Sequence, residues 1–214
     1  MKSHADTIPA KRAYRQGARA EAAEATAVRI LEAFQRRLST DWYDQITLDQ
    51  VAREAGVTVP TIIRRFGAKE GLLAGIQKLM DVEIMGRREV APGDVGAIVR
   101  VLIEDYEIIG DLAVRSLAQE ERYPAFRILT DLGRAGHRHW VEQSFSPWLD
   151  LADPEARRAR LDALVVATDL YVWKLVRRDM GRSPEHLRTL MLTLIAGIIG
   201  ATPDPTKQAG GDPR

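Results

Sequence analysis

Hydroxyl and guanidinium groups are concentrated in one short stretch of the chain. Thr58, Thr61, Arg64 and Arg65 lie there together with Val59. A guanidinium is a planar fork that can bond O6 and N7 of guanine together, and a threonine methyl can pack against the methyl group of thymine. The chemistry that this set could do is the reading of base edges in a DNA major groove. The alternative is that the two arginines only solvate an exposed helix face.

A short helix is predicted to begin after Thr47, ahead of this stretch. The Thr47 hydroxyl can cap it, because it takes up a backbone N–H that has no partner inside the helix. Leu48, Val51 and Ala52 repeat at helical spacing and give the helix one apolar stripe. Gly56 ends it, since glycine tolerates the left-handed backbone that follows many helices.

A second helix is predicted to begin at Thr58. Pro60 lies in its first turn, where the missing N–H costs nothing. Ile62 and Phe66 face inward, which leaves the two arginines facing outward. Two helices with this spacing are typical of the helix-turn-helix, in which the second helix enters the major groove and the first crosses the phosphate backbone.

Phosphate contacts are predicted for Thr47 and Lys69. Both lie at helix starts, where unpaired N–H groups and the helix dipole favour an anion. Such contacts position a protein on DNA and do not read sequence. The charge distribution agrees with a DNA-binding N-terminal part. Residues 1–80 carry 13 Lys+Arg against 9 Asp+Glu, whereas residues 81–214 carry 18 against 21.

The ordered string of residues in this region resembles the TetR/AcrR family of transcriptional regulators. The resemblance covers roughly Thr26 to Met80. It rests on Ile30–Phe34, Thr47, Val51, Ala52, Ala55–Thr58, Thr61, Ile62, Arg64, Phe66 and Lys69–Leu73. Ile63 stands where the family usually has a tyrosine, and Trp42 where it usually has a glycine. The resemblance implies an all-α protein, in which a three-helix DNA-binding head precedes a helical domain that binds a ligand and dimerises.

The chain divides into four predicted regions. They are a disordered basic arm (1–20), a helix-turn-helix head (21–68), a helical ligand-binding and dimerisation domain (69–200, with a connecting helix at 69–85) and a disordered tail (201–214). The other predicted helices are 21–38, 94–121, 126–148 in two pieces around Gly133 or Gly136, 154–180 and 184–200. An alternative for the arm is that its basic residues, Lys11, Arg12, Arg15 and Arg19, reach a DNA minor groove.

The last two predicted helices each carry a broad apolar stripe. Two amphipathic helices from each of two subunits can pack as a four-helix bundle. The family resemblance implies a homodimer of this kind. The candidate interface residues are Leu161, Val165, Val172, Leu187, Leu190, Met191, Leu194 and Ile198. The alternative is that both stripes serve only the core of the chain itself.

Aromatic and titratable residues gather between the head and these two helices. The family uses this region as a pocket for a small effector, often apolar or aromatic, and such pockets are mostly apolar with a few polar groups. The candidate pocket residues are Tyr106, Phe126, His137, Trp140, Trp148, Asp169 and Trp173. The alternative is that aromatics at helical spacing only fill the core.

Several other kinds of chemistry are not expected. The chain has no cysteine, which excludes disulfides and Cys-type zinc sites. His137 and His139 would point about 200° apart on one helix, so they cannot readily share a metal ion. No Gly-rich phosphate loop, nucleophile elbow or HExxH helix is present, so neither an enzyme nor a cofactor is expected. The absence of a signal peptide and of a long apolar run predicts a cytoplasmic protein without membrane association.

These observations together predict a homodimeric regulator that binds a palindromic double-stranded DNA operator and is released by a small effector. Three other interpretations stay open. They are an architectural DNA-binding protein without a ligand, a transcriptional activator on the same scaffold, and a helical small-molecule-binding protein or enzyme that retains the helix-turn-helix. The first predicts basic charge along the whole chain, whereas here it is confined to the N-terminal third.

Overall fold

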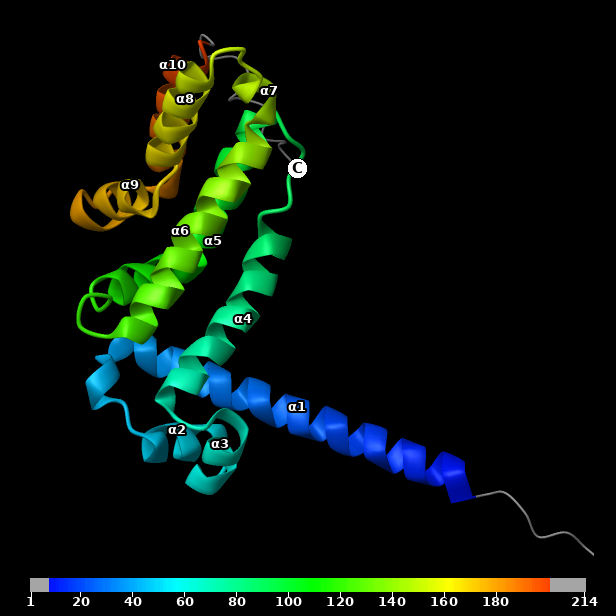
Figure 1. Cartoon of the computed structure of the whole chain (residues 1–214). Helices are drawn as coiled ribbons and strands as arrows, with labels where there is room; N and C mark the ends of the chain where they lie inside the picture. The colour runs from blue at the N-terminus through cyan, green and yellow to red at the C-terminus, as the bar shows by residue number, and fades with distance from the viewer. Residues whose placement is uncertain (1–7, 201–214) are drawn as a thin grey trace, which may run out of the picture. The chain divides into compact units, whose positions relative to one another are not determined.

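The first compact unit of the structure, residues 1–79, is built on one long helix. The structure is a computed structural model, which describes the backbone of residues 8–200 and the side chains of residues 17 and 19–200. Its elements are α1 (Ile8–Thr40), a 3₁₀ turn (Tyr43–Gln45), α2 (Leu48–Ala55), α3 (Val59–Phe66) and the first part of α4 (Lys69–Arg87) (Figure 1). α1 packs on α2, and α2 packs on α3. α1 is held on the unit by one apolar face, which is buried and consists of Ala27, Ile30, Leu31, Phe34 and Leu38.

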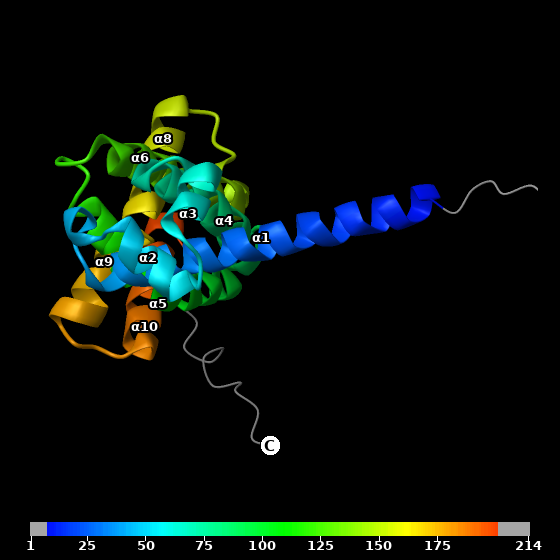
Figure 2. The same ribbon diagram turned by 90° about the horizontal axis from the view of Figure 1, so that it is seen from below.

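α1 begins earlier than predicted. The sequence prediction placed a disordered arm at residues 1–20, but the helix begins at Ile8. Residues 8–20 are mostly Ala, Arg, Lys and Gln, which are strong helix formers and need no apolar stripe to extend a helix. Pro9 falls in the first turn, where it is tolerated. The N-terminal half of α1 extends beyond α2 and α3 in both views (Figures 1 and 2). Residues 1–7 of the predicted arm, and the whole predicted tail, lie outside the described residues.

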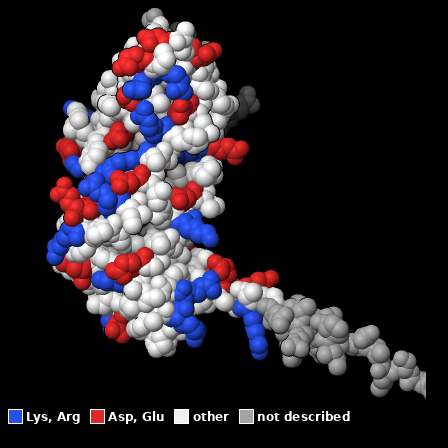
Figure 3. All heavy atoms as spheres, in the orientation of Figure 1, with Lys and Arg blue, Asp and Glu red and all other residues white. Residues whose placement is uncertain are grey.

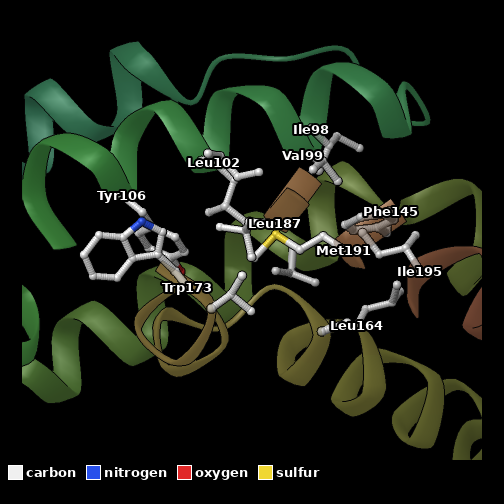
Figure 4. Packing of buried hydrophobic residues seen from close by; sticks show 14 of the residues in the cluster. Ile98, Val99, Leu102, Tyr106, Phe145, Leu164, Trp173, Leu187, Met191 and Ile195 are labelled. Atoms are coloured by element: carbon white, nitrogen blue, oxygen red, sulfur yellow. The ribbon is translucent and has the colours of Figure 1, made fainter. Parts of the chain in front are cut away.

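The second compact unit, residues 80–214, is a helical bundle. Its elements after α4 are α5 (Val95–Leu117), α6 (Pro124–Ser144), α7 (Ser146–Leu149), α8 (Pro154–Ala167), α9 (Leu170–Lys174), a π-helical turn (Leu175–Asp179) and α10 (Pro184–Ile199). α5 packs on α6, α9 and α10, and α8 packs on α6 and α10. Leu102 of α5 and Met191 of α10 belong to one core cluster with Trp173 of α9, whose ring lies beside Tyr106 (Figure 4).

Two of the predicted helices in this unit are divided differently. α6 is unbroken through Gly133 and Gly136, because a glycine in an exposed helix costs only about 1 kcal/mol relative to alanine. The predicted helix at 154–180 is interrupted at Thr168 and Asp169. The Thr168 hydroxyl donates to the Leu164 carbonyl (2.7 Å), and the Asp169 carboxylate accepts from the N–H of Tyr171 (2.8 Å) and so caps a new helix.

The all-helical fold class predicted from the sequence is confirmed for the described residues. They contain no strand. Every helix among residues 8–200 is too short or too polar to cross a lipid bilayer.

Candidate functional site

The turn between α2 and α3 is set by local capping, as predicted. The Thr47 hydroxyl accepts from the N–H of Gln50 (3.2 Å), and the Gln50 side chain accepts from the N–H of Thr47 (2.7 Å). This reciprocal pair is a capping box. Gly56 is left-handed at φ 66°, and the N–H of Val57 donates back to the Ala52 carbonyl (2.9 Å). The exposed Thr47 hydroxyl still has its own proton to donate, so its geometry is compatible with the predicted phosphate contact.

α3 presents a surface that mixes hydroxyls, one arginine and apolar groups. Thr58 is the N-cap residue, but its hydroxyl does not cap the helix and lies 3.0 Å from the Thr61 hydroxyl. Ile62 is fully buried, so α3 is fixed on the head by its inner face. Arg64 is exposed and has no hydrogen-bond or ion-pair partner among the described residues. Val59, in the first turn of α3, is half-buried. Arg64 is therefore available for a base edge.

Arg65 is placed differently from Arg64. Its guanidinium forms an ion pair with Glu24 of α1, a residue 41 positions earlier. The pair ties the C-terminal end of α3 to α1. Arg65 was predicted to contact DNA, but in this structure its charge is already partnered. The sequence prediction missed Glu24, because nothing in the local pattern indicates which distant carboxylate an arginine will meet.

Lys69 also has partners within the head. Its ammonium donates to the carbonyls of Tyr43 (2.8 Å) and Ile46 (2.9 Å) and lies 4.4 Å from the centre of the Tyr43 ring. These bonds hold the turn before α2 against the start of α4. An ammonium has three N–H groups, so one remains for the predicted phosphate contact. The larger role indicated by this geometry is structural.

Replacing Lys69 by methionine is expected to lower the free energy of unfolding by about 1–3 kcal/mol, because two carbonyls lose a charged donor. The measurement is a urea titration of the full chain. Lys78→Met is the matched control, since Lys78 is exposed on the same helix and has no partner among the described residues. Equal stabilities of the two variants would contradict the structural role.

Figure 3 shows one face of the molecule. Several blue Lys and Arg side chains lie over the region of α2 and α3 there, together with red Asp and Glu atoms. The excess of 13 Lys+Arg over 9 Asp+Glu in residues 1–80 gives this part of the chain a net positive charge. A net positive charge attracts a polyanion over a long range.

A buried ionic network lies in the second unit, and three residues at its edge, Tyr106, His137 and Trp140, belong to the predicted pocket set. Asp105 of α5 is fully buried and accepts from Nε of Arg87 (2.7 Å) through one oxygen and from Nε of Arg88 (2.7 Å) through the other. Arg88 is only 7% exposed. Its guanidinium lies 5.0 Å from the Tyr106 ring centre and 5.4 Å from that of Trp140. The network fixes the C-terminal end of α4 on α5 and α6.

His137 extends this network to the link between α8 and α9. Its Nδ1 lies 3.4 Å from Nη1 of Arg88, and its Nε2 lies 3.2 Å from the Thr168 hydroxyl. The Thr168 proton is directed to the Leu164 carbonyl, so the imidazole must donate from Nε2 and accept at Nδ1. Burial, and then the positive charge of Arg88, lower the pKa of His137 to about 3. The ring is therefore neutral at pH 7.

The neutral state of His137 predicts that the stability of the protein falls in mild acid. The unfolded chain takes up this proton near its ordinary pKa of 6.5, whereas the folded chain does so only near 3. Stability is therefore lost as the pH falls through 6.5 and continues to fall toward 3. Between pH 7 and pH 5 the loss through this one group is about 2 kcal/mol.

The check on that prediction is a urea titration at both pH values. A His137→Gln variant should show a pH dependence flatter by about 2 kcal/mol. His139→Gln is the matched control and should keep the dependence of the unmodified protein, since His139 is exposed on the same helix. The prediction is wrong if the two variants respond alike.

Three of the predicted pocket residues are closely packed in this structure. Tyr106, Phe126 and Trp173 are buried, and the Trp173 ring packs so closely on Gly110 that an added Cβ there would lie 2.5 Å from it. The Tyr106 hydroxyl donates to the Thr168 carbonyl (3.1 Å), and burial raises the Tyr106 pKa. Asp169 caps α9. The remaining three, His137, Trp140 and Trp148, are partly buried.

A shallow hollow of about 320 Å³ lies elsewhere in the same unit. It is lined by His139, Glu142, Gln143, Ser146, Leu149, Asp150 and Arg157, none of which was predicted. An ion pair between Arg157 and Glu142 (2.6 Å) crosses its wall. The hydrogen bond from Arg157 lowers the pKa of Glu142. All of its lining residues except Leu149 carry a polar or charged group. No group of three or more His, Asp or Glu side chains in the described part of the chain could hold a metal ion.

The predicted interface residues fall into two sets. Leu161, Leu187 and Met191 are buried in the core of the chain itself, so these three predictions were wrong. An apolar stripe in the sequence of a helix does not show which of its residues face the chain's own core and which remain exposed for a partner. Leu194 is 41% exposed, and Val166, which was not predicted, is 66% exposed. Val165, Val172, Leu190 and Ile198 are partly exposed.

Comparisons with known proteins agree with the head and the bundle. Residues 30–76 match the family described as "Bacterial regulatory proteins, tetR family". No curated protein matches the chain. A transcriptional regulator from Rhodococcus sp. Rha1 is similar in structure, with a TM-score of 0.65 and 17% identity over 84% of this chain and 99% of that one.

Two further solved structures share the fold. A TetR transcription regulator from Haloarcula marismortui has a TM-score of 0.54 and 18% identity over 83% of this chain and 97% of that one. The multidrug binding protein EbrR, complexed with imidazole, has a TM-score of 0.52 and 20% identity over 78% of this chain and 88% of that one.

Proposed function

We propose that this chain is a transcriptional regulator of the TetR family, which binds a palindromic operator as a homodimer and represses transcription there. The observation that carries the proposal is the outer face of α3. Arg64 is exposed and unpartnered among the described residues, beside the threonines of the same helix. The Thr47 capping box supports a phosphate contact at the start of α2. The first contact reads a base, and the second positions the head.

The proposed dimer interface is the exposed face of α8 and α10. Val166 on α8 and Leu194 on α10 are exposed, and Leu190 and Ile198 extend the α10 face at helical spacing. A second copy of the chain would cover these side chains in a four-helix bundle. A two-fold protein also matches the symmetry of a palindromic site.

The proposed effector is a small apolar or aromatic molecule that binds in the second unit among the aromatic residues of α5, α6 and α9. The side chains of Tyr106 and Trp173 are closely packed, so an effector would have to stabilise a state in which they have moved apart. Such a ligand has different affinities for the two states, which is the requirement for a shift between them. The naming of EbrR as a multidrug binding protein supports a small-molecule effector.

The coupling from effector to DNA would run through the buried ionic network. Arg87 and Arg88 lie at the C-terminal end of α4, and Lys69 lies at its other end in the head. A state that displaces Tyr106 also displaces Arg88, which lies over its ring. A coupling free energy of about 1–3 kcal/mol between effector and DNA would be ordinary for such a device.

The test is a binding titration with the DNA immediately upstream of the protein's own gene, with protected bases mapped. A dimer should protect two symmetric half-sites whose centres are about 34–36 Å apart or a multiple of that. Aromatic compounds are then added to the complex, and at least one should release the DNA. Weak binding that is equal on random DNA would overturn sequence-specific regulation. Protection of a single half-site would overturn the dimer.

A further inference from the structure

The outer face of α3 carries a large apolar side chain that no contact described above explains. Ile63 is 49% exposed. Residues three and four apart lie on one face of a helix, so Pro60, Ile63, Arg64 and Gly67 share that face. All four are exposed. The face thus joins an apolar strip to a single guanidinium.

Ile63 does not contribute to the core of the head. The isoleucines at positions 30, 46, 62 and 76 are each no more than 1% exposed. Ile63 is adjacent in sequence to the fully buried Ile62 and turns away from it. An isoleucine side chain that is exposed to water contributes burial free energy only when a partner covers it. The proposed function puts this face of α3 in the major groove, where DNA would cover the side chain.

The neighbouring polar groups leave few ways to read a base. The hydroxyls of Thr58 and Thr61 lie 3.0 Å apart, so one donates to the other and only one of the two O–H groups remains for a base. The Arg65 guanidinium is paired with Glu24. Arg64 is the charged group of α3 that has no partner among the described residues. Apolar contact therefore makes up a large share of what this surface offers to DNA.

We propose that Ile63 is a specificity-determining residue that packs on the 5-methyl group of a thymine, beside the guanine that Arg64 reads. The inference rests on the proposed function, because it requires a specific operator. In the major groove the thymine methyl is the apolar group of the base edges, and cytosine, which lacks it, presents an amino donor there. An isoleucine at this position selects thymine over cytosine through burial of the methyl and exclusion of a polar edge.

The test begins with selection of a binding sequence by the full-length protein from a pool of random duplex DNA. The tightest sequence is then made with deoxyuridine, which lacks only the methyl group, in place of each thymine in turn. Affinities are measured for the unmodified protein and for Ile63→Ala. Ile108→Ala is the matched control, because Ile108 is 66% exposed on α5 of the second unit.

Replacing the contacted thymine in one half-site should weaken binding about fourfold, and replacing its symmetric partner as well should weaken it about fifteenfold. Ile63→Ala should bind thymine and uracil DNA equally, whereas Ile108→Ala should keep the difference. A selected sequence that is indifferent to uracil at every position would overturn the inference and leave the proposed function standing. A uracil effect that persists in Ile63→Ala would overturn the assignment to this residue. Failure of any sequence to be enriched would overturn the proposed function, and the inference with it.

Discussion

Replacing Asp105 by asparagine is expected to lower the free energy of unfolding by about 3–5 kcal/mol. The carboxylate is fully buried between the guanidinium groups of Arg87 and Arg88, each at 2.7 Å. Asparagine keeps the shape but not the charge, so Arg88 would remain as an uncompensated charge at 7% exposure. A urea titration of the full chain followed by circular dichroism measures the loss.

Two further variants separate the effect of burial from that of the ion pair alone. Asp111→Asn removes a carboxylate that also meets an arginine at 2.7 Å, that of Arg178, but at a side chain that is 69% exposed. Its expected cost is about 0–1 kcal/mol, because exposed ion pairs contribute little. Arg87→Met should fall between the two, since Arg88 still neutralises Asp105 and one Arg87 nitrogen is buried without a partner. Similar costs for Asp105→Asn and Asp111→Asn would show that the buried network is not what holds α4 on the bundle.

The parts of the head that the sequence predicted are those that depend on neighbouring residues. The Thr47 cap, the left-handed Gly56 and the inward Ile62 each follow from interactions within four residues along the chain. Such interactions are set by residue type and spacing alone. The confirmed boundaries of α2 and α3 have the same origin. This is why the helix-turn-helix was the most predictable element of the fold.

The partners of the charged side chains were not predictable in the same way. Arg64 and Arg65 are adjacent and chemically identical, yet only Arg65 meets Glu24, 41 residues away. Lys69 meets carbonyls more than twenty residues earlier. These pairings depend on how α1, α3 and α4 pack, which no local pattern specifies.

One buried partner did leave a signal that the sequence prediction did not use. Asp105 stands three residues after Leu102 and four before Ile109, so it lies on the apolar face of α5. A lone carboxylate on such a face requires a buried cation. The break at Thr168 had no comparable signal, because Asp169 looks the same whether it lines a pocket or caps a helix.

Replacing Arg64 by alanine is expected to weaken binding to the operator by about 1–3 kcal/mol for each half-site, so by about twice that for a dimer. The guanidinium is exposed and unpartnered among the described residues, so nothing in the head has to rearrange when it is removed. Affinity for random DNA should change little, because a base contact carries sequence information and phosphate contacts do not. The measured quantity is the ratio of the two affinities at one salt concentration.

Arg65→Ala is the control that separates the loss of a positive charge from the loss of a base contact. The two arginines have the same charge and lie on the same turn of α3, but the Arg65 guanidinium is engaged by Glu24. If charge alone held the protein on DNA, the two variants would lose affinity equally, and would do so on operator and random DNA alike. If Arg64 reads a guanine, only Arg64→Ala lowers the ratio of operator affinity to random-DNA affinity. The slope of affinity against salt concentration then stays nearly the same. Equal losses of affinity for Arg64→Ala on both kinds of DNA would therefore show that Arg64 contacts no base and contributes only its positive charge.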